Sequence, residues 1–156
     1  QNQDMSPEAR FYLFLAARRE VIDRYIIPAL RRNDIVLTDR YFPCTIAYQG
    51  YGEGLDLNYV TSMSREAAHN ALPDRVFVLD ISPEEAWTRL KSRGESLHGF
   101  DAREPLFHER VRCGYLEQAQ ASPNYTIIDG TLPIPEVAHR IGQTILDDIG
   151  YALERF

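Results

Sequence analysis

The sequence lacks the features that mark three classes of protein. Its 17 Lys and Arg stand against 23 Asp and Glu, a net charge of −6, whereas binding to DNA or RNA relies on an excess of basic side chains. No uncharged run approaches the roughly 18–20 apolar residues of a membrane span, and no signal peptide is recognisable. We therefore expect no nucleic-acid polymer and no membrane among the partners, although a single nucleotide needs only a few local cations.

Cysteine is also scarce. Cys44 and Cys113 are the only two, and neither has a CxxC partner. A disulfide and two free thiols are both open readings, and the second is favoured, which predicts a reducing, cytoplasmic setting. Apolar residues, by contrast, make up 44% of the 156 positions, enough for the hydrophobic core of one ordinary domain.

Helix signals recur along the chain. Ser6-Pro7-Glu8 combines an N-cap serine with a first-turn proline and an acid, and the helix that it starts should kink or end near Pro28. Ser82 and Glu85 have the spacing of a capping box, and Gly94 should close that helix. Apolar spacing predicts three more helices, at about 57–71, 107–121 and 135–149.

Three short, continuously apolar runs predict strands that are buried on both faces, at 35–38, 76–80 and 125–129. Their alternation with helices predicts an α/β fold, a parallel sheet flanked by helices. Asp39, Asp80 and Asp129 stand at the ends of these runs, where such sheets bind ligands. Turn capping is the favoured reading for Asp80 and Asp129, and a functional role is favoured for Asp39 because of its neighbours.

The richest chemistry follows the first predicted strand. Arg40 offers a fork for phosphate oxygens. The adjacent carboxylate of Asp39 has three roles open to it: accepting a proton from an attacking phosphate, holding a metal-bound water, or orienting the arginine. Thr45, Tyr48 and Gln49 follow at helical spacing. We expect them on roughly one face of a short helix, where they offer hydrogen bonds and an aromatic wall to a flat ligand.

A second pair lies on the first helix. Phe14 and Arg18 are four residues apart, so they point the same way. An aromatic ring can stack on a base while the guanidinium group binds its edge. Such a pair taken alone is more often a core residue beside a surface residue, but Asp39 and Arg40 follow on the next strand, which shifts the balance toward a binding site.

Together, these motifs resemble the thymidylate kinases of the bacterial type. The resemblance runs from about residue 6 to 149, and four motifs in order make it specific. They are Phe14-Leu15-Ala16-Ala17-Arg18, Asp39-Arg40-Tyr41, Thr45-x-x-Tyr48-Gln49-Gly50 and Phe107-His108-Glu109-Arg110-Val111-Arg112-x-Gly114-Tyr115-Leu116. The resemblance implies a P-loop nucleoside monophosphate kinase fold. It also implies an enzyme that uses ATP and Mg²⁺ to convert dTMP to dTDP, and a homodimer packed through helices, for which the first helix and the helix from Leu57 are favoured.

The resemblance also assigns the side chains that contact the nucleoside. Phe14 stacks on the thymine ring, and Arg18 binds an edge carbonyl of the base. Thr45 and Gln49 add polar contacts nearby. Tyr48 packs under the deoxyribose, where a 2′-hydroxyl would clash, and so favours deoxynucleotides.

The phosphate and metal contacts come from another set. Arg40 holds the dTMP phosphate. Asp39 lies close to the reacting oxygens and contacts Mg²⁺ through a water. Residues from about 93 to 104 resemble the family's lid, in which an Asp-Arg pair is usual. Here that pair is replaced, while the acid that follows it is kept as Asp101. Arg93 or Arg103 is then expected to take the arginine's place.

One motif of the family is missing from the sequence. No G-x-x-x-x-G-K-[ST] loop for the ATP phosphates occurs in residues 1–156, and the glycines of 50–54 follow a helix, so we interpret them as a turn. In the family the loop and two strands precede the point where this chain starts. We expect residues 1–156 to be the larger, C-terminal part of a single thymidylate kinase domain, within a longer protein or with a segment omitted.

The alternatives are a nucleotide-binding or dimerisation module without turnover, and a kinase for another nucleoside monophosphate. A chain that truly lacks the phosphate loop would be such a module and would bind dTMP without converting it. Among kinases, Phe14, Arg18 and Tyr48 favour thymine, but the sequence leaves dUMP and a broader range open.

Overall fold

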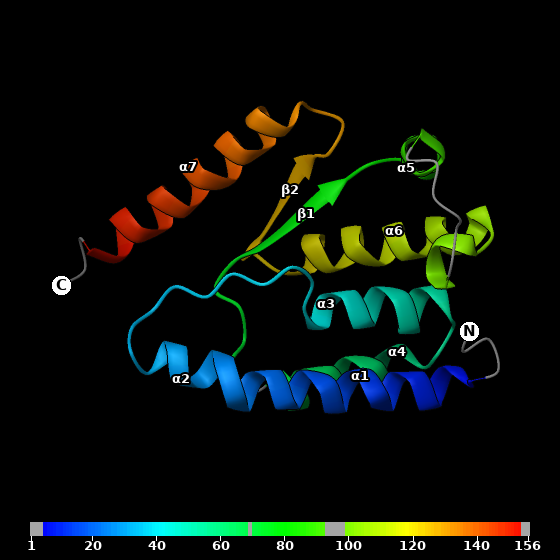
Figure 1. Ribbon diagram of the computed structural model, residues 1–156, viewed down its shortest axis with the longest axis horizontal. Helices are drawn as coiled ribbons and strands as arrows, with labels where there is room; N and C mark the ends of the chain where they lie inside the picture. Colours follow the sequence, from blue (N-terminus) through cyan, green and yellow to red (C-terminus); the bar gives the residue numbers. More distant parts are fainter. Residues whose placement is uncertain (1–4, 69, 93–98, 154–156) are drawn as a thin grey trace.

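The computed structural model of the chain (Figure 1) describes residues 5–68, 70–92 and 99–153. The α/β class is confirmed, with helices dominating. The helices and strands are, in order, α1 (Pro7–Val21), η1 (Ile22–Ile26), α2 (Ile27–Leu30), α3 (Phe42–Thr45), η2 (Ile46–Gly52), α4 (Leu57–Ala68), β1 (Val76–Asp80), α5 (Pro83–Ser92), η3 (Gly99–Ala102), α6 (Pro105–Ala121), β2 (Tyr125–Asp129) and α7 (Ile134–Leu153).

The first helix begins where the sequence predicts and changes pitch ahead of Pro28. Ser6 is the N-cap, and its hydroxyl oxygen accepts a hydrogen bond from the Ala9 backbone N–H at 3.2 Å. Proline has no backbone N–H, and its ring crowds the carbonyl of the preceding turn. The chain accommodates it with a wider π-turn, η1, in which Ile27 N–H donates to Ile22 O. The helix then continues as α2 and ends at Leu30.

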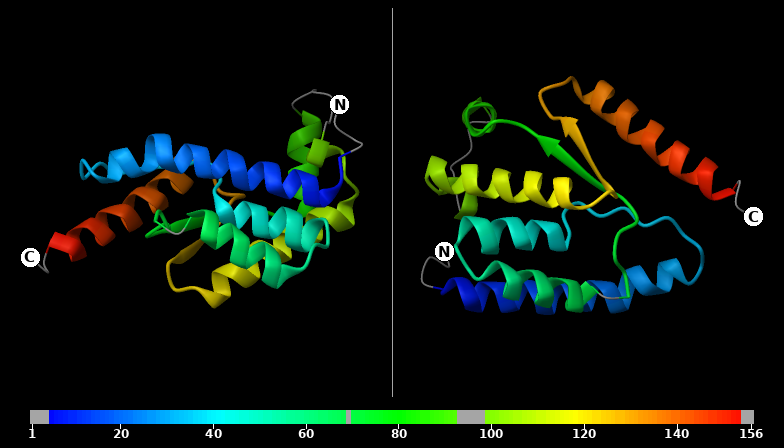
Figure 2. Two further views of the ribbon diagram at one scale, coloured as in Figure 1. Left: turned by 90° about the horizontal axis from the view of Figure 1, so that it is seen from below. Right: turned by 180° about the vertical axis from the view of Figure 1, so that it is seen from behind.

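The elements stack in a fixed order, which Figures 1 and 2 show from three sides. α1 and α4 lie side by side against α3 and η2, α6 covers the other side of η2, and the sheet packs between α6 and α7. The larger core lies among α1, η1, α3, η2 and α4. Its buried side chains are Phe11, Leu15, Ile22, Ile26, Phe42, Ile46, Val60, Ala68 and Ala71.

A smaller core forms where α6 meets η2, and it depends on glycine. A Cβ atom added at Gly114 would lie 2.6 Å from Cδ2 of Tyr51, and one added at Gly52 would lie 2.7 Å from Cε2 of Phe107. Neither position has room for a side chain, so the two helices approach closely. Tyr51 Oη also donates to Glu117 of α6 at 2.7 Å. This contact fixes η2, which carries several predicted site residues.

Several details of the predicted helices need correction. Over 50–54, only the last two residues form a turn, because the first three continue η2. Ser82 caps α5 by accepting from Glu85 N–H at 3.2 Å, but the Glu85 side chain pairs with Arg89, so only half of the capping box forms. The predicted end at Gly94 lies outside the described residues. α4 ends at Ala68, earlier than the predicted 71, and α6 and α7 each begin earlier than predicted.

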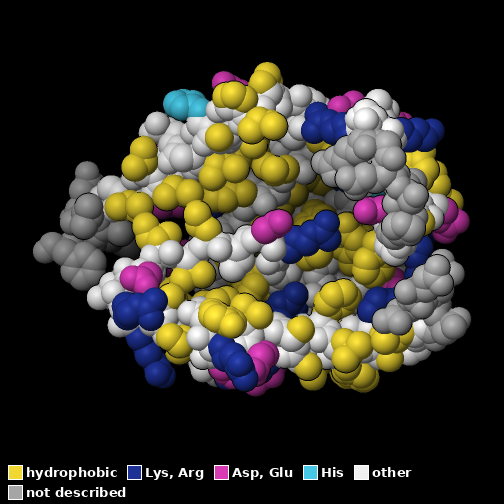
Figure 3. All heavy atoms as spheres, in the orientation of Figure 1, with side chains coloured by type: hydrophobic (Ala, Val, Ile, Leu, Met, Phe, Trp, Pro, Cys, Tyr) yellow, Lys and Arg dark blue, Asp and Glu magenta, His cyan; other side chains and the backbone are white. Residues whose placement is uncertain are grey.

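Two of the three predicted strands form. β1 and β2 pair in parallel, with Val76 opposite Tyr125 and Asp80 opposite Asp129. The two aspartates therefore lie at the same end of the sheet, as expected. Hydrophobic side chains gather over the sheet and α7 in Figure 3. Leu79 of β1 is 52% exposed.

The third prediction, a strand at 35–38, is wrong for the described chain. These residues have no regular structure, and Ile35 and Leu37 are 70% and 78% exposed. A strand is held by hydrogen bonds to a neighbouring strand, and in the described residues the sheet consists of β1 and β2 alone. The apolar pattern indicated burial, but no described strand lies beside this segment to provide it.

None of the described helices has the length and apolar character needed to cross a membrane.

The α6–η2 contact can be tested with two glycines. We expect Gly114→Ala to lower the free energy of unfolding by about 1–3 kcal/mol, because the new methyl group overlaps Tyr51. Gly142→Ala is the matched control, since no atom lies within 4 Å of its added Cβ and alanine favours a helix by about 0.5–1 kcal/mol. Urea denaturation followed by circular dichroism measures both, and equal effects would contradict the packing argument.

Candidate functional site

Two helices that run side by side carry most of the predicted site residues. Near one end of their contact, Arg18 of α1 donates to Thr45 of α3. Near the other end, Arg10 of α1 donates to Glu53, directly after η2. These pairs occur in opposite order along the two helical segments, so the segments are antiparallel. Phe14 lies on α1 between the two arginines, four residues from each, and is 39% exposed.

Arg18 is anchored but keeps an unused donor. Its Nη2 donates to Thr45 Oγ1 at 2.8 Å, and its guanidinium carbon lies 5.6 Å from the centre of the Tyr41 ring. Its Nη1 is buried and has no hydrogen-bond partner among the described residues. Burial lowers the pKa of Arg18. A buried donor without an acceptor is costly, so this group is suited to a carbonyl or phosphate oxygen of a ligand.

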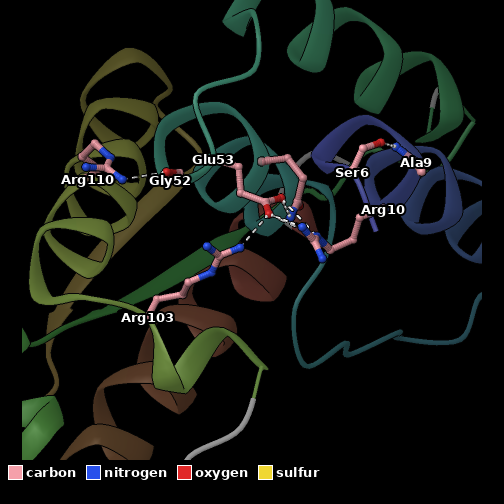
Figure 4. A network of polar contacts seen from close by, with 8 residues as sticks. Ser6, Ala9, Arg10, Gly52, Glu53, Arg103 and Arg110 are labelled. Atoms are coloured by element: carbon pink, nitrogen blue, oxygen red, sulfur yellow. Dashed lines mark hydrogen bonds and ion pairs between the residues drawn. The ribbon is translucent and has the colours of Figure 1, made fainter. Parts of the chain in front are cut away.

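Glu53 has polar partners from three parts of the chain (Figure 4). Its side chain is 2% exposed and lies 2.7 Å from Arg10 Nη2 and 3.5 Å from Arg103 Nη2. It also accepts from Gln49 Nε2 at 3.1 Å. An ionised carboxylate only accepts hydrogen bonds, so the Gln49 amide turns its NH₂ group to Glu53. The carbonyl oxygen of Gln49 remains for another partner.

Arg40 adopts a strained backbone conformation. Its φ of 67° lies in the left-handed region, which costs a residue other than glycine roughly 1–2 kcal/mol. Its guanidinium carbon lies 5.4 Å from the centre of the Tyr48 ring, and Nη1 is 3.8 Å from Cys44 Sγ. Such strain is found where a fold holds a functional group in place. Arg40 is exposed, so it remains open to a ligand.

Aromatic rings form the second side of the site. Tyr48 meets Phe100 of η3 edge-on at 5.1 Å, and Phe100 stacks on Phe107 of α6 at 5.7 Å. Burial raises the pKa of Tyr48, and the charge of Asp101 in η3 acts in the same direction. Thr45 and Gln49 are buried and contact Arg18 and Glu53, whereas Tyr48 turns toward η3 and α6. The residues predicted on one helical face thus serve two sides of the site.

The strand-end aspartates have separate structural roles. Asp129 accepts from the backbone N–H of Thr131 at 2.8 Å, so it caps a turn as predicted. Asp80 does not cap a turn, because its carboxylate pairs with Arg112 of α6 at 2.6 and 2.8 Å. The hydrogen bonds from Arg112 hold the pKa of Asp80 below its usual value. Both carboxylates are therefore engaged, and neither faces the residues of α1 and η2.

The structure brings together some predicted residues and leaves others apart. Arg18 and Thr45 are in direct contact, and so are Arg40 and Tyr48. Asp39 is exposed, and its carboxylate has no hydrogen bond or ion pair among the described residues. Its predicted place at the end of a strand is absent because that strand does not form.

Two residues of the network were not predicted to belong to the site. Arg10 lies four residues before Phe14, a spacing that was available as a signal. Glu53 gave no such signal, because its role depends on partners that are distant in sequence. The lid prediction falls partly on residues 93–98, outside the described residues.

Two cavities flank these residues. One, of about 200 Å³, is lined by Pro83, Glu84, Trp87, Arg103, Pro105 and His108. The other, of about 260 Å³, lies between α3–η2, α4 and the end of α6 and contains no predicted site residue. Across residues 5–68, 70–92 and 99–153, no group of three or more His, Cys, Asp or Glu could hold a metal ion.

Both cysteines in the described structure are free. Cys44 is partly buried beside Arg40, and Cys113 is exposed on α6. The favoured reading of two free thiols is confirmed, and the disulfide is not formed.

Comparisons with known proteins agree with one another. A family model described as thymidylate kinase matches residues 1–141. A thymidylate kinase of Chlamydia caviae is 40% identical over 140 residues, which cover 88% of this chain and 67% of that protein. One from Desulfosudis oleivorans is 37% identical over 147 residues, with coverages of 90% and 69%. One from Thermomicrobium roseum is 38% identical over 144 residues, covering 92% and 69%. The chain thus spans about two thirds of the length of these relatives.

The Arg18 anchor gives a prediction about stability. We expect Thr45→Val to lower the free energy of unfolding by about 1–2 kcal/mol, because it leaves a second donor of Arg18 without an acceptor. Thr45→Ser keeps the hydroxyl group and is the matched control, with a smaller expected loss. Thermal and urea denaturation compare the two variants. Equal stability of the valine and serine variants would show that the hydrogen bond contributes nothing measurable.

Proposed function

Because the chain belongs to the thymidylate kinase family, whose members are nucleoside monophosphate kinases, we propose that it transfers the γ-phosphoryl group of ATP to dTMP, giving dTDP and ADP. The observation that carries the proposal beyond the family match is the buried, unpartnered Nη1 of Arg18, beside the exposed ring of Phe14. A flat ring with a carbonyl edge satisfies both groups at once.

The base is held from α1 and α3–η2. Phe14 stacks on thymine, and Arg18 donates to a carbonyl on its edge. Thr45 fixes the Arg18 guanidinium and adds to the polar rim. Gln49 presents its carbonyl oxygen, which suits the ring N–H that stands next to that carbonyl in thymine and uracil. This pair of a donor and an acceptor supports a thymine-type edge over that of cytosine.

The sugar and phosphate follow along the same helix. Tyr48 packs under the deoxyribose, and Arg40 binds the phosphate of dTMP. The contact between these two side chains, 5.4 Å from guanidinium carbon to ring centre, supports the assignment, because sugar and phosphate are neighbours in a nucleotide. Phosphoryl transfer depends on positioning and on charge neutralisation, and the guanidinium group of Arg40 can supply both.

The groups assigned to catalysis are Asp39, Arg40 and Arg103. Mg²⁺ usually binds through one or two carboxylates together with waters and phosphates, and the exposed, unpaired carboxylate of Asp39 fits a contact through a water. The ion, when bound, neutralises charge on the phosphates. The lid of this proposal is the segment 93–104. Within it, Arg103 is the catalytic arginine and Asp101 binds substrate.

No residue of this chain is assigned to the ATP phosphates, because the loop motif is not among residues 1–156. We assign residues 1–156 to the larger, C-terminal part of one kinase domain. A homodimer through α1 and α4 is part of the proposal. Exposed Leu13, at 57%, and Tyr59, at 42%, support it. The free thiols of Cys44 and Cys113 support action in the cytoplasm.

The first test is ADP release from Mg·ATP with dTMP, dUMP, dCMP, dGMP and AMP as separate acceptors. We expect a strong signal with dTMP and little with dCMP or AMP, because cytosine and adenine lack the carbonyl beside a ring N–H that matches Arg18 and Gln49. Calorimetric titration with dTMP is measured in parallel. Binding without turnover would favour a nucleotide-binding module, and a preferred acceptor other than dTMP would favour another nucleoside monophosphate kinase.

Arg40 gives a prediction that separates function from stability. We expect Arg40→Gly to lower kcat by about 10²–10³-fold, as for the loss of one preorganised charge-stabilising donor. Its stability should be unchanged or higher by up to about 1 kcal/mol, because glycine tolerates a φ of 67°. Steady-state kinetics and urea denaturation measure the two effects. Arg40→Lys is the control that keeps the charge, and a fully active Arg40→Gly enzyme would remove the phosphate-binding role.

A further inference from the structure

Glu53 is a buried charge for which the proposed reaction has no use. Its side chain is 2% exposed, and a carboxylate is retained at such a place only when several donors satisfy it. Arg10 binds it most closely, through Nη2 at 2.7 Å and Nε at 3.1 Å. Gln49 supplies a neutral donor, and Arg103 a second cation. The hydrogen-bond donors thus come from α1 and η2, and the second cation comes from the segment just before α6 (Figure 4).

The two arginines reach from Glu53 onto the aromatic side of the site. The Arg10 guanidinium lies 5.6 Å from the centre of the Phe100 ring, and the Arg103 guanidinium lies 5.6 Å from that of Phe107. Phe100 in turn rests edge-on against Tyr48. Arg103 therefore ties residues 99–103 to the carboxylate of Glu53. This contact holds Phe100 against Tyr48, whose ring is assigned to the deoxyribose.

We propose that Glu53 is a positioning residue that joins the two sides of the site. On one side it orients the Gln49 amide, whose carbonyl oxygen then faces the base. On the other side it holds Arg103, and with it the segment that carries Phe100. This inference rests on the proposed function for the identity of the ligand. The hold of Glu53 on Arg103 is a property of the protein without nucleotide.

The chain contains a fluorescent reporter for the contact between Glu53 and Arg103. Trp87 is the only tryptophan, and it lines the same cavity as Arg103 and Pro105. Release of Arg103 opens this cavity wall, so acrylamide gains access to the indole ring. Fluorescence quenching of Trp87 therefore reports on residues 103–105 without substrate or turnover.

Glu53→Gln and Arg10→Gln form a matched pair of variants. Both break the ion pair between residues 10 and 53, and both exchange a charged side chain for glutamine. Only Glu53→Gln removes the charge that holds Arg103 and lets the Gln49 amide rotate, because glutamine both donates and accepts. We expect both to lower the melting temperature. Glu53→Gln alone should increase Trp87 quenching, weaken dTMP binding about tenfold, and reduce the preference for dTMP over dCMP.

Arg103→Gln completes a double-mutant cycle with Glu53→Gln. The Arg103 side chain is 48% exposed, so we expect this variant to fold. We expect it to increase Trp87 quenching as much as Glu53→Gln does, and the double variant to go no further. Equal quenching and equal dTMP affinity in Glu53→Gln and Arg10→Gln would overturn the proposal, and so would additive effects in the cycle. A wild-type protein that does not bind dTMP would refute the proposed function, whereas the quenching comparison in nucleotide-free protein would still decide the role of Glu53.

Discussion

The antiparallel contact between α1 and α3–η2 is the constraint on which the rest of the structure depends. It is closed at one end by Arg18 and Thr45 and at the other by Arg10 and Glu53. Buried apolar side chains of both helices fill the core beneath it. The polar pairs therefore set the register of two helices whose packing energy comes from hydrophobic burial. Phe14 lies on α1 midway between Arg10 and Arg18, the arginines of the two pairs.

Helices rather than the sheet position the site in this chain. β1 and β2 lie between α6 and α7, and their terminal carboxylates are engaged by Arg112 and by the turn after β2. η2 is held from both sides, by α4 on one and by α6 on the other. Close approach at Gly52 and Gly114 makes this possible. A helix fixed on several sides can hold Tyr48 and Gln49 without the mobility of a loop.

Three charged residues with costly features mark the functional region. Arg18 keeps a buried donor unpaired, Arg40 keeps a left-handed backbone, and Glu53 is almost fully enclosed. Each feature lowers stability unless neighbouring groups or a ligand compensate. All three have contacts to α3–η2 or lie directly after it, and this is the physical argument for a binding site that is independent of any resemblance to other proteins.

The sequence by itself determined the local elements: the capped start of α1, the strands β1 and β2, and the pair of Phe14 and Arg18 on one helical face. These follow from near-neighbour spacing, which short-range sterics and hydrogen bonds control. Only the tertiary structure decided that the apolar run at 35–38 has no strand partner in the described part of the chain, and that Glu53 joins Arg10 to Arg103. Strand pairing and buried ion pairs require partners that are distant in sequence, and no local pattern encodes where those partners come to lie.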